Sequence, residues 1–123
     1  SEVGIRGARL ASLEGNVEAA CRYLRLILDT YFNDPALDQL NRHLFALAAY
    51  NAGPNRVQAL RAKAQAAGLD PNVWFGNVEQ LVANEVGQGP INYVSTIYKY
   101  YVAYRFSLPQ LEGKAAAIEA ARP

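Results

Sequence analysis

Residues 44–49, LFALAA, limit the possible folds more than any other stretch, because the run contains no polar side chain. A helix that is apolar on every side has no face to present to water, so other elements must surround it. Tyr50 and Asn51 follow this run, and Gly53-Pro54 comes almost directly after them. Gly adopts backbone conformations that other residues avoid, and Pro fixes φ and lacks an N–H, so this pair ends one helix and can start the next. The sequence therefore predicts a central buried helix that ends in a corner carrying a Tyr and an Asn.

Composition agrees with a single helical domain. The chain has 123 residues, which is enough for one core and too few for two ordinary domains. Its 21 Ala residues outnumber Val, Ile and Thr together. Ala loses little entropy in a helix, whereas β-branched side chains lose rotamer freedom there. We therefore expect the all-α class.

The charge and hydropathy patterns exclude several kinds of partner. The formal net charge is +1, from acidic and basic residues scattered along the chain, so no strong field would attract nucleic acid or anionic lipid. No run of 18 or more apolar residues occurs, and the first residues lack a signal-peptide pattern. We expect a soluble chain without a membrane span. Because it begins on Ser rather than Met, we also expect it to be part of a longer gene product.

Apolar spacing and helix-breaking residues predict five helices. The first begins at Asn16 as N-cap, follows an apolar stripe to Phe32 and stops near Pro35. The others are expected at 37–51, from Pro54 to Gly68, at 78–86 and at 90–106. No internal repeat or heptad pattern is recognised. Residues 1–106 should form the domain, and the Ala-rich tail 107–123 is expected to be mobile or a short helix.

Several side chains of these elements have an expected environment. Cys21 lies among apolar residues and is expected to be a small buried side chain rather than a reactive thiol. Trp74 and Phe75 lie in a loop and should either anchor it to the core, which we favour, or line a cleft. The fifth helix contains five Tyr, which either fill a wide buried face or point one or two hydroxyls into a polar cleft. Three basic residues of the third helix should face solvent, namely Arg56, Arg61 and Lys63.

Elimination leaves carboxylates as the candidates for chemistry. His43 and Cys21 stand alone and neither HExxH nor CxxC is present, so we expect no zinc site and a place for His43 on a rim. Neither a Gly-rich phosphate loop nor a Ser, His and Asp set occurs. Glycosidic cleavage needs an acid, usually a Glu or Asp whose pKa is raised in a partly apolar cleft. The available glutamates are better explained as exposed carboxylates, and none can be named as catalyst: Glu14, Glu18, Glu79 and Glu85.

Three segments together resemble a known family. They are NVEAACRYLRLILDTYFND at 16–34, LFALAAYNAGPNRV at 44–57 and INYVSTIYKYYVAYRF at 91–106. They resemble the later part of the catalytic domain of lytic murein transglycosylases, the lysozyme-like SLT fold, and the AYNAGP corner is a highly specific motif of that family. GLDPNVWFGNVEQ at 68–80 further resembles the membrane-bound murein transglycosylase F subgroup. The resemblance implies a lysozyme-like domain that lacks the N-terminal helices of the full fold.

The resemblance also implies an activity and site residues. Enzymes of this family cut the β-1,4 bond between N-acetylmuramic acid and N-acetylglucosamine of periplasmic peptidoglycan, without water, metal or cofactor. One Glu protonates the bridging oxygen and then acts as base while the muramyl C6 hydroxyl closes a 1,6-anhydro ring. By position, Asn51 should hydrogen-bond the substrate or intermediate. Tyr50 should shape the cleft floor, and Tyr93 should lie beside the acid.

The family's catalytic Glu does not occur at a matching position. It belongs to a Glu-Ser motif followed by Gly-Leu-Met-Gln, whereas this chain has no Met and begins with Ser and Glu in the reverse order. We therefore expect the chain alone to be inactive. Without the helix that bears the acid, the central helix would expose apolar surface, which predicts self-association or a covering partner segment. A non-catalytic peptidoglycan-binding or regulatory module and a purely structural helix junction are the alternatives.

Overall fold

The computed structural model describes the backbone of residues 2–121 and the side chains of residues 15–121, and every regular element in this range is helical. The order is α1 (Glu2–Tyr31), α2 (Gln39–Ala52), α3 (Pro54–Ala66), the π-helical turn η1 (Trp74–Val78), α4 (Glu79–Glu85) and α5 (Gln88–Ala121). These elements confirm the predicted all-α, lysozyme-like class. Glu14, one of the glutamates considered from the sequence, has a side chain outside the described residues.

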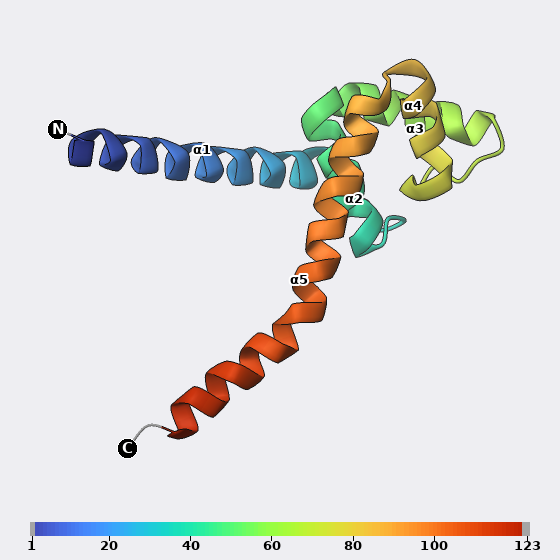
Figure 1. Ribbon diagram of the computed structural model, residues 1–123. Coiled ribbons are helices and arrows are strands. Elements are labelled where there is room, and N and C mark those ends of the chain that lie inside the picture. The colour runs from blue at the N-terminus through green and yellow to red at the C-terminus, as the bar shows by residue number, and fades with distance from the viewer. Residues whose placement is uncertain (1, 122–123) are drawn as a thin grey trace.

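α2 is the centre of the packed body. It contacts α1, α3, α5 and η1, and the outer parts of α1 and α5 extend away from this body in different directions (Figure 1). α2 begins at Gln39 because the Asp38 carboxylate accepts a hydrogen bond of 2.7 Å from the Asn41 backbone N–H, as an N-cap does. The predicted burial of the apolar run is confirmed, since its most buried members are at most 2% exposed: Leu44, Phe45, Ala46, Ala48 and Ala49.

α1 differs from the predicted helix in its start and in the face that it buries. The helix passes through Asn16, so the predicted N-cap is wrong. The last turns of α1 reach the core through Ile27 and Leu28. Cys21 is exposed, and the predicted buried thiol is therefore also wrong. The spacing of the apolar stripe is helical, but α1 projects past the packed body (Figure 1), so the upstream part of the stripe finds few neighbours.

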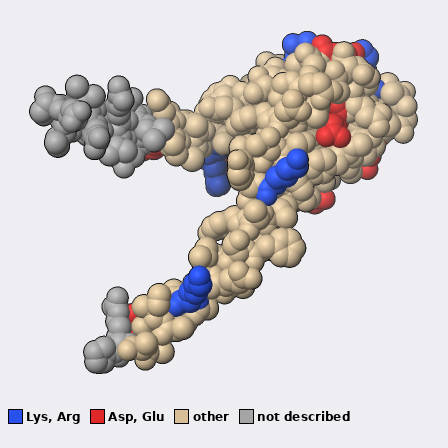
Figure 2. Space-filling view, viewed as in Figure 1, with Lys and Arg blue, Asp and Glu red and all other residues tan. Residues whose placement is uncertain are grey.

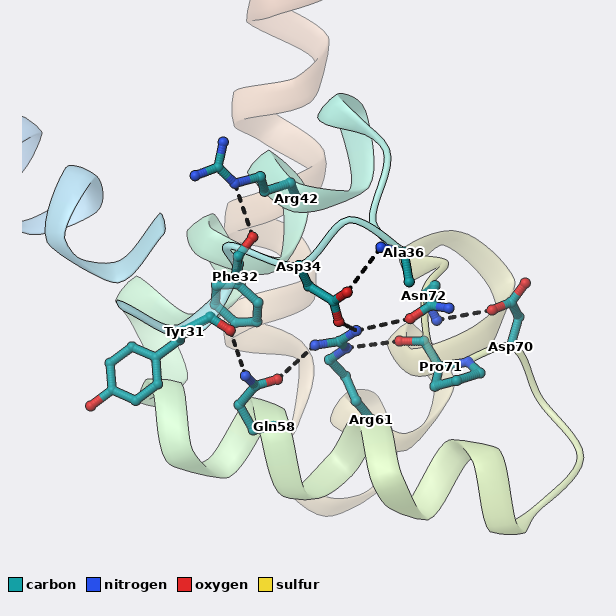
Figure 3. Close-up of polar contacts among 10 residues, drawn as sticks. All are labelled: Tyr31, Phe32, Asp34, Ala36, Arg42, Gln58, Arg61, Asp70, Pro71 and Asn72. Carbon is teal, nitrogen blue, oxygen red and sulfur yellow. Dashed lines mark hydrogen bonds and ion pairs between the residues drawn. The ribbon is translucent and has the colours of Figure 1, made fainter. Parts of the chain in front are cut away.

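Arg61 on α3 is buried, which corrects the prediction that it faces solvent. Figure 3 shows its guanidinium surrounded by acceptors. Nε donates to the Pro71 carbonyl oxygen at 2.8 Å, Nη1 to Gln58 Oε1 at 2.8 Å and Nη2 to Asn72 Oδ1 at 2.9 Å. The planar group therefore ties the loop after α3 to the middle of that helix.

The charge of Arg61 is balanced by a carboxylate and by aromatic faces. Asp34 lies 3.9 Å away as an ion pair, and the guanidinium carbon lies 5.0 Å from the centre of the Phe45 ring. Burial lowers the pKa of Arg61, and Asp34 partly opposes this shift. Arg56 and Lys63 are exposed as predicted. The three basic residues therefore do not share one environment, because only Arg61 faces the two loops that supply its acceptors.

The loop between α3 and α4 is anchored by Trp74, as predicted. Trp74 is fully buried, and its ring meets Phe45 edge-on with centroids 6.0 Å apart. Its backbone N–H donates to Oδ1 of the buried Asn41 at 2.9 Å. Phe75 is 37% exposed and packs edge-on against Tyr98, with centroids 5.1 Å apart. Phe75 thus covers α5 from outside, and Trp74 supplies the anchor.

α5 is much longer than predicted. It starts at Gln88 and continues through Pro109 to Ala121, so the segment expected to be a separate tail is the end of this helix. Figure 1 shows α5 bending in the part that contains Pro109, as expected for a residue that lacks the N–H of a helical hydrogen bond. The predicted wide buried Tyr face is wrong beyond Tyr98, since Tyr100, Tyr101 and Tyr104 are more than half exposed.

Candidate glycan-binding site

The predicted corner lies between α2 and α3. The Gly53 N–H donates to the Ala49 carbonyl at 2.8 Å and closes α2, and the Gly53 carbonyl accepts from Val57 N–H at 3.1 Å and opens α3. Gly53 has φ 98°, in the region that side chains other than Gly rarely adopt. No atom lies within 4 Å of the place where a Cβ would stand, so conformation rather than space selects Gly here. The corner holds Tyr50 and Asn51 in the last turn of α2.

Three Tyr rings from three helices meet at this corner. The Tyr50 ring stacks on Tyr93 of α5, with centroids 6.1 Å apart and planes 13° apart. Tyr23 of α1 meets the Tyr50 ring edge-on, with centroids 5.6 Å apart. The structure therefore brings the two predicted tyrosines together and adds Tyr23, which lies off the apolar stripe and gave no signal in the sequence.

Asn51 presents its carboxamide to solvent. The residue is exposed, and its side chain makes no hydrogen bond with another residue in the described part of the chain. Asn41, near the other end of α2, is buried and has both ends of its amide engaged: Nδ2 donates to the Asp38 carboxylate, and Oδ1 accepts from the Trp74 N–H. A free carboxamide can donate and accept at once, as recognition of a sugar N-acetyl or hydroxyl group requires.

The phenol of Tyr93 is shielded at the edge of this cluster. Burial raises the pKa of Tyr93 above its ordinary value of 10.0, and the neighbouring Tyr50 adds to the shift. A proton held more tightly in the folded state stabilises the fold below the unfolded-state pKa and ceases to do so as the pH rises through the folded-state pKa. We therefore expect the free energy of unfolding to fall as the pH rises above about 10.

This expectation can be checked by urea unfolding at a series of pH values between 9 and 11. Tyr93→Phe should make the decline above pH 10 shallower than in the wild type, because the shielded phenol is removed. Tyr100→Phe, at a ring that is 71% exposed, is the matched control and should leave the decline unchanged. Identical pH profiles for wild type and Tyr93→Phe would contradict the assignment.

None of the described candidate glutamates is arranged as a general acid. Glu18 pairs with Arg22 on α1, and the Glu18 side chain is 64% exposed. Glu79 accepts a hydrogen bond from the Gly76 N–H at 3.2 Å, and Glu85 pairs with Lys63. A catalytic acid needs a partly apolar cleft that keeps it protonated. Glu18 and Glu85 are exposed and paired with cations, and Glu79 is partly exposed and bonds a backbone N–H next to α4.

An apolar groove of about 720 Å³ lies between α1 and α5, with α2 as its floor. We call it the α1–α5 groove. Its walls include Leu24, Leu28, Leu47, Ile97 and Tyr101, and its polar side chains include Arg25, His43 and Arg105. His43 thus lies at a rim, as predicted, with Nδ1 2.7 Å from the Gln39 carbonyl oxygen. Tyr50, Asn51 and Tyr93 do not line this groove.

Metal ligation has no support in the described side chains, because no three His, Cys, Asp or Glu residues gather there. Nor does any helix in the described range combine the length and the apolar character that crossing a membrane requires.

Comparison with known proteins identifies the family of the domain that contains the corner. A model of the transglycosylase SLT domain matches residues 8–73, which include Tyr50 and Asn51. Among curated proteins, membrane-bound lytic murein transglycosylase F of Stutzerimonas stutzeri is 32% identical over 97 residues, covering 67% of this chain and 20% of that protein. The protein of the same name from Pseudomonas fluorescens is 28% identical over 117 residues, covering 83% of this chain and 24% of that protein.

The chain matches only part of the length of its curated relatives. It spans about a fifth to a quarter of the length of the curated relatives that it matches. No solved structure matches significantly. With the SLT model matching more than half of its residues, the chain belongs to the transglycosylase SLT domain family.

Proposed function

We propose that this chain forms the glycan-holding part of a peptidoglycan lytic transglycosylase and lacks the acid of the reaction. The observation that carries the proposal is the exposed carboxamide of Asn51, which bonds no other described residue and follows Tyr50, whose ring stacks on Tyr93. Sugar recognition commonly combines a flat aromatic face with an amide that can donate and accept, and this corner offers both. The names of the curated relatives support murein as the polymer.

Each residue of the corner has a role in this proposal. The Asn51 carboxamide bonds the N-acetyl group or a hydroxyl of the sugar, and the Tyr50 ring supports the sugar from below. The Tyr93 hydroxyl, which stays protonated at neutral pH, donates a hydrogen bond near the bridging oxygen. In the complete enzyme a Glu from another segment protonates that oxygen, and the muramyl C6 hydroxyl then closes the 1,6-anhydro ring.

The location and partners follow from the same assignment. Murein lies in the periplasm, so we propose that the chain acts there on a glycan strand, as part of a protein anchored to a membrane by another segment. No cofactor enters the reaction. We further propose that a second copy or a partner segment covers the α1–α5 groove, since an apolar groove of this size is unfavourable in water.

Binding of muropeptides tests the role of Asn51. Asn51→Ala should raise the Kd by about 2- to 10-fold, which is the usual worth of one net hydrogen bond. Titration calorimetry with purified disaccharide muropeptides measures the change. Asn84→Ala, at an exposed amide on α4, is the matched control and should bind as the wild type does. Equal affinity of the wild type and Asn51→Ala would reduce the corner to a helix junction.

The absence of the acid is tested by turnover. Murein sacculi incubated with the chain should release no 1,6-anhydromuramyl product, because a general acid contributes on the order of 10² to 10⁴ in rate. Release of that product would overturn this part of the proposal. Glu14→Gln and Glu18→Gln would then show which carboxylate acts.

A non-catalytic peptidoglycan-binding module is the second candidate, favoured by the ion pairs of Glu18 and Glu85 and by the backbone hydrogen bond that Glu79 accepts. The residues encoded immediately before Ser1 separate the two functions. Upstream Glu-Ser and Gly-Leu-Met-Gln motifs would predict turnover by the longer protein, and their absence would favour binding alone.

A further inference from the structure

α5 carries an apolar stripe along nearly its whole length. The members follow alternating steps of four and three residues, which is the spacing of the two core positions of a heptad: Pro90, Val94, Ile97, Tyr101, Tyr104, Leu108, Leu111, Ala115 and Ile118. This pattern corrects the interpretation that the sequence holds no heptad. It becomes visible only because the structure continues α5 through Pro109 as one helix.

The stripe is buried where α5 crosses the body and exposed beyond it. Pro90 and Val94 are buried within this chain's own core. Tyr101, Tyr104 and Ile118 are 51%, 57% and 62% exposed. Past Tyr101 and Arg105, which still line the α1–α5 groove, the same face of α5 continues for two heptads without a neighbour from the described chain. Figure 2 shows this outer part of α5 as mainly uncharged surface.

We propose that the outer part of the stripe, from Tyr101 to Ile118, pairs with the same residues of a second copy of this chain, in antiparallel orientation. We call this part the outer stripe. This inference rests on the self-association proposed above and names its surface. Three heptads of apolar spacing are typical of a coiled coil rather than of a helix that stays in solvent. A symmetric pair needs no other partner, because one stripe faces itself about a two-fold axis.

Side-chain size favours the antiparallel register. With Leu108 of one copy opposite Leu111 of the other, the bulky Tyr104 lies opposite the small Ala115, and Tyr101 lies opposite Ile118. Large residues opposite small ones fill a helix interface without voids or overpacking. A parallel pair would instead set Tyr101 against Tyr101 and Ala115 against Ala115, which mismatches the volumes in successive layers.

Charge favours the same register. Arg105 and Glu112 flank the stripe, each directly after a core residue, and no ion pair joins either of them to another residue in the described range. The Arg105 guanidinium carbon lies 6.0 Å from the centre of the Tyr101 ring, beside the stripe. In the antiparallel register Arg105 of each copy faces Glu112 of the other, which gives two opposite-charge pairs across the interface. Pro109 falls on the outer face, so its ring stays out of the contact.

The register also supplies an occupant for one end of the α1–α5 groove. Ile97 and Tyr101 belong both to the stripe and to the wall of the groove. Since Tyr101 lies opposite Ile118 of the second copy, the end of the partner's α5 reaches the mouth of the groove. One contact would thus cover the outer face of α5 and one end of the groove.

Sedimentation equilibrium of the full chain tests the surface. The wild type should dimerise, and Leu108→Glu with Leu111→Glu should raise the dimer Kd by at least about tenfold, because a charge at a core position must be desolvated without a partner. Ala117→Glu, on the outer face of the same helix, is the matched control and should leave the Kd unchanged. Circular dichroism checks that the variants keep their helix content.

A charge exchange tests the orientation. Arg105→Glu and Glu112→Arg should each raise the dimer Kd by about 2- to 5-fold, since two pairs of ordinary strength are lost together. The double variant should return to the wild-type Kd, because each charge again faces its opposite. A parallel pair would not show this rescue.

The outcomes separate the two levels of the proposal. Dimerisation that is lost with the core Glu variants and rescued by the charge exchange supports it. A dimer that none of these variants weakens would overturn the α5 surface while self-association itself stands. A monomer at 100 micromolar wild-type chain would overturn both, and it would leave the glycan-binding role of Asn51 untouched.

Discussion

Trp74→Ala should lower the free energy of unfolding by about 4 kcal/mol, within the range of full truncation of a buried Trp. Trp74 is completely buried and fixes the loop between α3 and α4 against Phe45, with ring centroids 6.0 Å apart. Domains of this size are typically stable by about 5–15 kcal/mol, so this loss would leave little margin. Urea unfolding followed by circular dichroism measures it, because the variant removes the chain's single Trp and its fluorescence.

Trp74→Phe is the matched control. The indole Nε1 is buried and has no hydrogen-bond partner among the described residues, so Phe removes an unsatisfied polar group while keeping an aromatic ring. We expect this variant to lose less than half of what Trp74→Ala loses. A loss below about 1 kcal/mol for Trp74→Ala would show that the loop is not anchored by this ring.

The corner could be predicted from the sequence because its conformation is decided locally. Gly53 closes one helix and Pro54 opens the next within two residues, and both roles are properties of the residues themselves. Burial of the apolar run was predictable for a similar reason, since a helix without a polar face has one acceptable environment. The place of Tyr50 and Asn51 at the end of α2 followed from these two facts.

Burial elsewhere depends on partners that are distant in the sequence. The spacing around Cys21 is helical, yet its exposure depends on where α1 leaves the packed body. Tyr23 joins the aromatic cluster through contacts between helices, which no pattern within α1 reveals. The spacing predicts a helix that ends at 106, whereas α5 continues to Ala121, because a Pro inside a helix can bend it without ending it.

The predicted exposure of Arg61 is the largest of these errors. The burial of Arg61 also gives the second prediction with a large effect on stability. From the sequence it is one of three basic residues on an Ala-rich helix, and its acceptors on Pro71 and Asn72 lie in a loop whose path was unknown. Arg61→Ala should lower the free energy of unfolding by about 3 kcal/mol, because it leaves several partly buried acceptors without their charged donor. Thermal or urea unfolding measures the loss.

Two further variants separate geometry from charge at this position. Arg61→Lys keeps the charge but cannot reach three acceptors at once or place a planar group over the Phe45 ring, so it should recover less than half of the loss. Arg56→Ala, at an exposed Arg on the same helix with one hydrogen bond to the Glu85 carbonyl, should change stability by no more than about 0.5 kcal/mol. Full recovery by Lys would mean that the positive charge facing Asp34, rather than the planar set of hydrogen bonds, holds the two loops on α3.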